Sequence, residues 1–307
     1  MFIETHMHIS LNGENATLFR KQLKERDKNA EELIRKTIIA YKSRGIFAIR
    51  DGGDTLDIYD IVRRIAKEEG IIYKTPISAI YKKGFYGSLI GKPIENINDF
   101  KNLMQKMKKH NPDFIKIPLT GMMNFDVYGD TGEIAFTIEE LDYMAKYAKD
   151  NDLPIMVHAN SKKAIQMAIK VGVNTIEHGY YLTEEELYAL KERNIVWIPT
   201  LTPLGNIIYA NDKRFIKQNK IIRKIFEEQC EKIYQAHEMG VRIAVGSDSG
   251  AYRVYHGSGF FDELIYLNKA GIKKKTLIEI GERNGLKALN ITKKQLESAR
   301  DEIIEHS

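Results

Sequence analysis

Short apolar runs alternate with longer amphipathic stretches from one end of the chain to the other. Eight runs rich in Val, Ile and Phe are strand candidates: residues 1–6, 45–50, 71–80, 114–118, 153–158, 174–178, 195–199 and 241–246. These runs are too apolar to show the alternation of polar and apolar residues that is expected of a strand with one solvent-exposed face. Such runs are typical of strands that are buried on both faces, as in a parallel sheet.

Helical periodicity fills the intervals between these runs. The predicted helices cover residues 31–44, 57–69, 97–109, 137–149, 162–171, 184–193 and 215–239. Glycines just past several of them, such as Gly172 and Gly240, suit left-handed C-caps. The pattern predicts an α/β protein with a (β/α)8 TIM barrel, which forms a single domain over 1–307. We expect the barrel over about 1–290, with extra C-terminal helices that end in one over about 291–307.

An open doubly wound sheet is the alternative architecture. It would usually carry a glycine-rich phosphate loop after its first strand. Here the first run ends instead in the sequence Thr-His-Met-His, residues 5–8. The barrel is therefore favoured.

Composition and charge exclude several classes of protein. The 307 residues include 47 Lys and Arg against 42 Asp and Glu, which gives a net charge of +5 without a dense basic stripe, so we expect no nucleic-acid partner. A single cysteine, Cys230, cannot form an internal disulfide and suits a reducing, cytoplasmic location. We expect no membrane segment and no leader peptide. A small-molecule substrate is the expected partner, and a homo-oligomer is compatible with the sequence.

Polar residues stand at the ends of five of the predicted strands. In a barrel of this kind, catalytic groups lie where the strands end. Each residue alone has an ordinary explanation, such as capping or hydrogen bonding. Together, four imidazoles and a carboxylate at one end of a barrel suit a divalent metal, zinc above all. These five residues are His6, His8, His158, His178 and Asp248, and Lys116 completes the set of candidate metal ligands.

Lys116 lies inside the otherwise apolar fourth run, where an unpaired ammonium is costly. One interpretation is a core lysine whose head group reaches a nearby carboxylate. The other is a lysine that has reacted with carbon dioxide, because the resulting carbamate is anionic and offers two oxygens to metal ions. The sequence leaves both interpretations open.

These motifs, in this order, resemble those of the amidohydrolase superfamily, in its imidazolonepropionase and prolidase-like branch. The resemblance rests on the His6-Met7-His8 triplet and on five further segments: GIFAIRDGGD (45–54), DFIKI (113–117), VHAN (157–160), IEHG (176–179) and GSDSG (246–250). It covers nearly the whole chain.

The resemblance implies a hydrolase that cleaves an amide bond with a metal-activated hydroxide. It places His6, His8 and Asp248 on one Zn²⁺, His158 and His178 on a second, and a carboxylated Lys116 between the two. Asp248 is then also the catalytic proton acceptor. Dipeptides, N-acyl amino acids, cyclic amides and lactones are all compatible substrates.

Four residues near the strand ends are weaker candidates for substrate contacts. Tyr86 lies in the sequence GFYG, where relatives often place a histidine, and Tyr181 matches a position where relatives hold a substrate carboxylate. Arg253 and His256 follow Asp248 in the next loop. The small β-sandwich of most relatives is expected to be absent.

Two alternatives to an amide hydrolase remain. One is a one-metal deaminase of the same superfamily, although such enzymes carry a glutamate soon after the fifth-strand histidine, and here Ser-Lys-Lys follows (161–163). The other is a metal-binding barrel without turnover.

Overall fold

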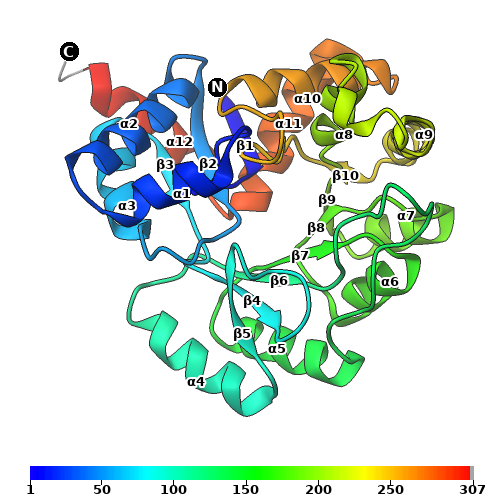
Figure 1. Ribbon diagram of the computed structural model, residues 1–307, viewed down its shortest axis with the longest axis horizontal. Helices are drawn as coiled ribbons and strands as arrows, with labels where there is room; N and C mark the ends of the chain where they lie inside the picture. Colours follow the sequence, from blue (N-terminus) through cyan, green and yellow to red (C-terminus); the bar gives the residue numbers. More distant parts are fainter. Residues whose placement is uncertain (305–307) are drawn as a thin grey trace.

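The computed structural model describes residues 1–304 and shows parallel strands surrounded by helices (Figure 1). Residues 305–307, at the end of the predicted last helix, lie outside the described part. One set of paired strands consists of β1 (Phe2–Met7), β2 (Ile46–Asp51) and β3 (Ile72–Lys74). The other consists of β6 (Ile115–Pro118), β7 (Ile155–Ala159), β8 (Thr175–His178), β9 (Val196–Ile198) and β10 (Arg242–Ile243).

The two sets of strands join into a ring. On one side, the Thr5 amide donates to the Val245 carbonyl (3.1 Å), which connects β1 to the segment after β10. On the other side, the Asp113 amide before β6 donates to the Thr75 carbonyl after β3 (2.9 Å). Each of these eight strands overlaps one of the eight predicted apolar runs, and the predicted TIM barrel is confirmed.

Helices pack around the outside of the ring and follow the chain in order (Figure 1). They are α1 (Ala16–Lys24), α2 (Lys28–Lys42), α3 (Tyr59–Glu68), α4 (Ile97–Lys108), α5 (Ile138–Asp150), α6 (Lys162–Val171), α7 (Glu184–Glu192), α8 (Thr202–Tyr209), α9 (Asn219–Met239), α10 (Ser258–Lys269), α11 (Lys274–Leu289) and α12 (Lys293–Ile304). A short 3-10 helix, Lys213–Phe215, precedes α9. Gly172 and Gly240 cap α6 and α9 with φ of 78° each, as predicted.

The third predicted strand, 71–80, is wrong as a single element. The structure divides it into β3 and β4 (Ala79–Lys82). Pro76 lies at the break, where it provides no amide for a ladder, and Ile77 adopts a left-handed φ of 71°. A further strand that was not predicted, β5 (Gly91–Ile94), pairs in parallel with β4.

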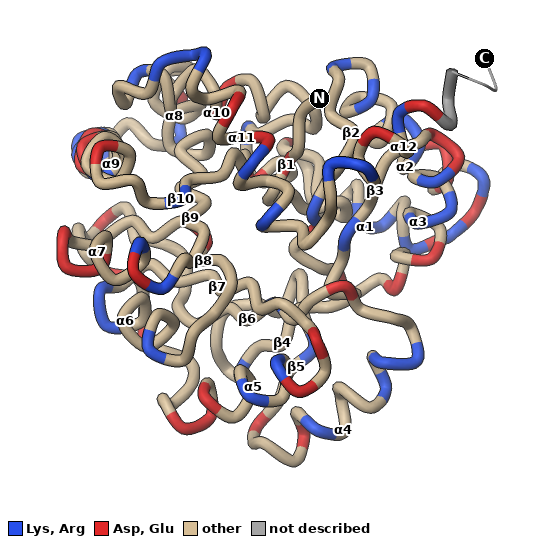
Figure 2. The backbone as a smooth tube through the Cα atoms, turned by 180° about the vertical axis from the view of Figure 1, so that it is seen from behind, with Lys and Arg blue, Asp and Glu red and all other residues tan. Residues whose placement is uncertain are grey.

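Charged residues of both signs are distributed over the outer helices (Figure 2). Some charged side chains are instead buried, on the strands of the barrel. These are Glu4, Arg50, Asp51, Lys116 and Glu177. The interior of such a barrel is normally filled by Val, Ile and Leu. No helix within residues 1–304 is both long and apolar enough to span a bilayer.

Candidate metal centre

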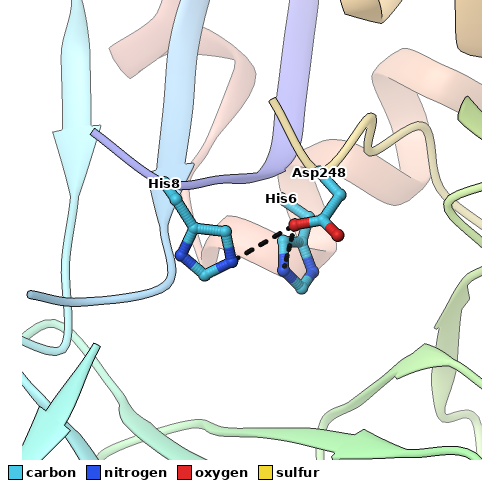
Figure 3. A group of neighbouring side chains, drawn as sticks. All are labelled: His6, His8 and Asp248. Atoms are coloured by element: carbon cyan, nitrogen blue, oxygen red, sulfur yellow. Dashed lines mark ion pairs between the residues drawn. The ribbon is translucent and has the colours of Figure 1, made fainter. Parts of the chain in front are cut away.

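His6, His8 and Asp248 converge at the end of β1 (Figure 3). Asp248 Oδ1 lies 3.2 Å from His8 Nε2 and 3.5 Å from His6 Nε2. One nitrogen or oxygen from each of the three residues lies within 4.8 Å of the others. A nitrogen–nitrogen–oxygen set at this spacing could hold a divalent cation.

The backbone at the seam of the barrel brings these residues together. The Asp248 amide donates to the His6 carbonyl (2.8 Å), and the His8 amide donates to the Ser249 carbonyl (2.7 Å). Asp248 itself has a left-handed φ of 59°, which is uncommon for a residue other than glycine. Such strain is typical of functional sites, where the surrounding structure holds a residue in place.

Gly52, just after β2, leaves room for the His8 ring. A Cβ atom at this position would lie 2.2 Å from His8 Cε1 and 2.7 Å from Nδ1. Any side chain here would therefore clash with the imidazole and displace it from its observed position.

His158 and His178 lie beside the first group, on β7 and β8. Their ring centroids are 4.5 Å apart, and the His178 ring is 5.0 Å from that of His6. His178 Nδ1 contacts the Thr200 hydroxyl at 2.6 Å, whereas His158 Nε2 lies 3.0 Å from the Gly121 carbonyl oxygen. The four strand-end histidines thus form one continuous group of imidazoles.

Lys116 is buried on β6 with 1% of its surface exposed. Its Nζ atom has no hydrogen-bond partner among residues 1–304. Burial lowers its pKa to about 8, while Glu177 partly opposes this change. An amine that loses its proton this readily is a better nucleophile towards carbon dioxide than an ordinary lysine.

Burial keeps His6, His158 and His178 neutral and therefore able to bind a metal. Burial, followed by the charge of Lys116, lowers the pKa of His6 to about 4 and that of His158 to about 3. Burial alone would raise the pKa of Asp248, but His8, His6 and Lys116 hold it below its usual value. The carboxylate is thus ionised at neutral pH.

Several buried atoms at this site lack a hydrogen-bond partner within the described residues. Buried polar atoms are rarely left unpaired unless an ion, a water or a ligand satisfies them. These atoms are His6 Nε2, His8 Nδ1, Lys116 Nζ and Asp248 Oδ1.

The predicted substrate contacts fall in different surroundings. The Tyr86 ring lies 5.3 Å from that of His158, and the charge of Asp248 adds to the effect of burial in raising the Tyr86 pKa. The Tyr181 hydroxyl accepts a bond from the Gly129 amide (3.2 Å). Arg253 is paired with Asp212. Tyr86 is thus the candidate that lies against the imidazole group.

His256 is held between two other parts of the protein. Its Nε2 lies 2.7 Å from the Leu11 carbonyl oxygen, and its Nδ1 lies 2.8 Å from the Tyr41 hydroxyl. Neither ring nitrogen is left for a substrate, so the expected substrate role of His256 gains no support. The carbonyl only accepts, so Nε2 carries the proton and Nδ1 accepts from the tyrosine.

This arrangement predicts a pH-dependent stability. Burial lowers the pKa of His256 to about 4, against 6.5 for the free side chain. Between pH 6.5 and about pH 4 the unfolded chain binds a proton at His256 that the folded chain does not. The free energy of unfolding therefore falls as the pH falls through this window, and His256 contributes at most about 1.4 kcal/mol per pH unit. Urea unfolding of metal-free protein across the window should show this contribution of His256 added to those of the other buried histidines, His6 and His158 among them. His256→Gln should have a shallower slope, and an unchanged slope would contradict the assignment.

Two residues behind the imidazoles were not among the predicted site residues. Glu177 on β8 contacts His6, and Arg50 on β2 pairs with Glu177. Both are charged residues inside apolar runs, which is the same signal that identified Lys116.

Comparison with known proteins identifies a family and several relatives. The model of the amidohydrolase family matches residues 2–296. Ochratoxinase of Aspergillus niger is 29% identical over 115 residues, which are 37% of this chain and 24% of that protein. An uncharacterized protein of Mycobacterium tuberculosis is 28% identical over 120 residues, 38% of this chain and 32% of that one. The matched segments thus span a third or less of these relatives.

Solved structures match over nearly the whole chain. A Xaa-Pro dipeptidase with bound methionine has a TM-score of 0.76 at 22% identity, covering 94% of this chain and 75% of that one. The structure of A. niger ochratoxinase has a TM-score of 0.75 at 17% identity, covering 94% and 71%. A putative prolidase from Bifidobacterium longum has a TM-score of 0.72 at 19% identity, covering 94% and 69%. These identities show a shared fold, and the family match over residues 2–296 places the chain in the amidohydrolase family.

Proposed function

We propose that this protein is a metal-dependent hydrolase that cleaves an amide bond in a small peptide-like, N-acyl amino acid or cyclic amide substrate. The observation that carries the proposal is the convergence of two buried imidazole nitrogens on one carboxylate oxygen of Asp248. Amide hydrolysis needs an activated water and a polarised carbonyl, and this donor set suits the cation that supplies both. The ochratoxinase and prolidase names of the relatives support the same class of reaction.

The unpaired His6 Nε2 and Asp248 Oδ1 fit a divalent cation beside His8, and the neighbouring His158 and His178 suit a second. Zinc is the best match to imidazole and carboxylate ligands. His6, His8 and Asp248 would hold one ion, and His158 and His178 the other. Lys116, as a carbamate, would lie between the two. The cations would lower the pKa of an attacking water from about 15.7 towards about 7 and polarise the scissile carbonyl.

Residues of this chain would handle the proton. The Asp248 side chain is 15% exposed, so water and substrate can reach it from the open end of the barrel. Its lowered pKa leaves it ionised and ready to accept the proton of the attacking water. It can then pass that proton to the departing amine. Tyr86, beside His158, is the best-placed group to orient the substrate.

A substrate screen tests the proposal directly. Zinc-loaded protein is incubated with a library of dipeptides and N-acyl amino acids, and amine release is measured. We expect turnover of at least one subclass, its loss on chelation and its return on adding zinc back. A library without any turnover in the loaded protein would contradict the amide-hydrolase assignment.

Metal content separates this proposal from its rivals. After zinc loading and removal of free ion, elemental analysis should give about two equivalents per chain. The groups around His6 and around His158 predict this value, since each offers its own donors. One equivalent would favour a one-metal deaminase, and none would leave a barrel without metal chemistry.

A further inference from the structure

We propose that Glu177 is a positioning residue that fixes the tautomer of His6, so that the Nε2 lone pair of His6 is directed at the metal centre. The inference rests on the proposed function, because it concerns how that centre is built. Its partner is Arg50, which holds the Glu177 carboxylate in place.

The contact between Glu177 and His6 determines where the ring proton lies. Glu177 Oε2 is 2.5 Å from His6 Nδ1. An ionised carboxylate can only accept a hydrogen bond, so Nδ1 must donate and carries the proton of the neutral ring. The other nitrogen, Nε2, then presents a lone pair, and it is the nitrogen that lies 3.5 Å from Asp248 Oδ1.

Arg50 prevents the carboxylate from turning away. Its Nη2 atom donates to both Glu177 oxygens, at 3.0 and 3.2 Å. Its Nε atom donates to the Thr5 carbonyl (2.7 Å), one residue before His6. The Thr175 hydroxyl donates to Glu177 Oε1 at 2.5 Å. The guanidinium thus ties the carboxylate to the same strand that carries the histidine.

Stability alone is a poor explanation for these buried charges. Arg50 and Glu177 are 2% and 0% exposed, in a layer that apolar side chains usually fill. Replacing a buried ion pair by apolar residues of similar size is often neutral or stabilising. Glu177 has no exposed surface through which it could contact a substrate. The ion pair provides a hydrogen-bond acceptor for His6 Nδ1, and an apolar pair would not provide one.

Two variants test the role. Glu177→Gln keeps the shape but adds an amide donor that can reverse the bond to His6. Arg50→Met combined with Glu177→Leu removes both charges and leaves neither of them unpaired in the interior. This double variant tests the role if the single variant fails to fold. Glu263→Gln is the matched control, because Glu263 is another fully buried glutamate that accepts bonds from Leu201 and Thr202.

The first readout does not need a metal. Long-range ¹H–¹⁵N spectra of metal-free, histidine-labelled protein report which ring nitrogen carries the proton. We expect His6 to be protonated at Nδ1 in the wild type and in Glu263→Gln, and to change to a mixture or to the Nε2 form in the other two variants. Protonation at Nδ1 that persists without Glu177 would overturn the inference.

The second readout is metal affinity. Competition with a chromophoric chelator should show zinc bound about 10- to 100-fold more weakly in both Glu177 variants, with an altered Co²⁺ absorption spectrum, and unchanged values in Glu263→Gln. If the wild type binds zinc and all variants bind it with the same affinity, the inference about Glu177 is overturned but the proposed function is not. A wild-type protein that binds no metal would overturn the proposed function as well.

Discussion

Asp248→Asn should abolish hydrolysis while the barrel remains folded. The amide oxygen can still accept a hydrogen bond, but it carries no negative charge and does not take up the proton of an attacking water at neutral pH. Loss of a general base alone costs about 10²- to 10⁴-fold in rate. Asp248 also faces both His6 and His8, so the weakened metal centre should add to this loss.

Steady-state kinetics on the best substrate of the screen, together with circular dichroism, would measure this effect. Asp142→Asn is the matched control, since Asp142 lies on the outer helix α5 in an ion pair with Lys146. That variant should retain wild-type turnover. Near-normal turnover in Asp248→Asn would refute the assignment of Asp248 as the proton acceptor.

Lys116→Ala should lose activity that short carboxylic acids partly restore. The truncation removes the amine that would carry the carbamate and leaves a buried space on β6. Acetate or propionate can enter such a space and replace the two carbamate oxygens. The structure supports this expectation through the unpaired, fully buried Nζ atom and the lowered pKa of the amine.

The measurement is turnover against acid concentration, with zinc content followed in parallel. Lys170→Ala, on the exposed surface of α6, is the control and should be indifferent to the acids. Rescue confined to Lys116→Ala supports the carbamate. If no acid restores either turnover or zinc content, Lys116 is an ordinary core lysine.

Much of the fold could be predicted because each strand carries its own signal. A strand buried on both faces must be apolar along its length, so the apolar runs located the barrel strands. The prediction failed around Pro76, which interrupts the predicted strand with a residue that lacks an amide for the ladder. Hydrophobicity reports burial, whereas pairing also depends on backbone donors.

The candidate site could be predicted only in part, because a sequence shows which residue types stand at strand ends but not which partners they meet. His6 and His8 were recognisable as a pair two residues apart. The contact between His6 and Glu177 joins residues 171 positions apart, and only the closed barrel reveals it. The place of Arg253 and His256 in the loop after Asp248 predicted substrate contacts, yet Arg253 pairs with Asp212, and His256 bonds to Leu11 and Tyr41.

The seam between the first and last strands has a consequence for how the molecule responds to a bound ion. His6 and His8 stand near the start of the chain and Asp248 near its end, and only the closing of the ring joins them. A cation held by all three would therefore link the first strand to the segment after the last one. Because such a cation binds only the closed barrel, it shifts the equilibrium away from local opening. The amides of Thr5 and His8 should then exchange with solvent more slowly in the metal-bound protein than in the metal-free protein.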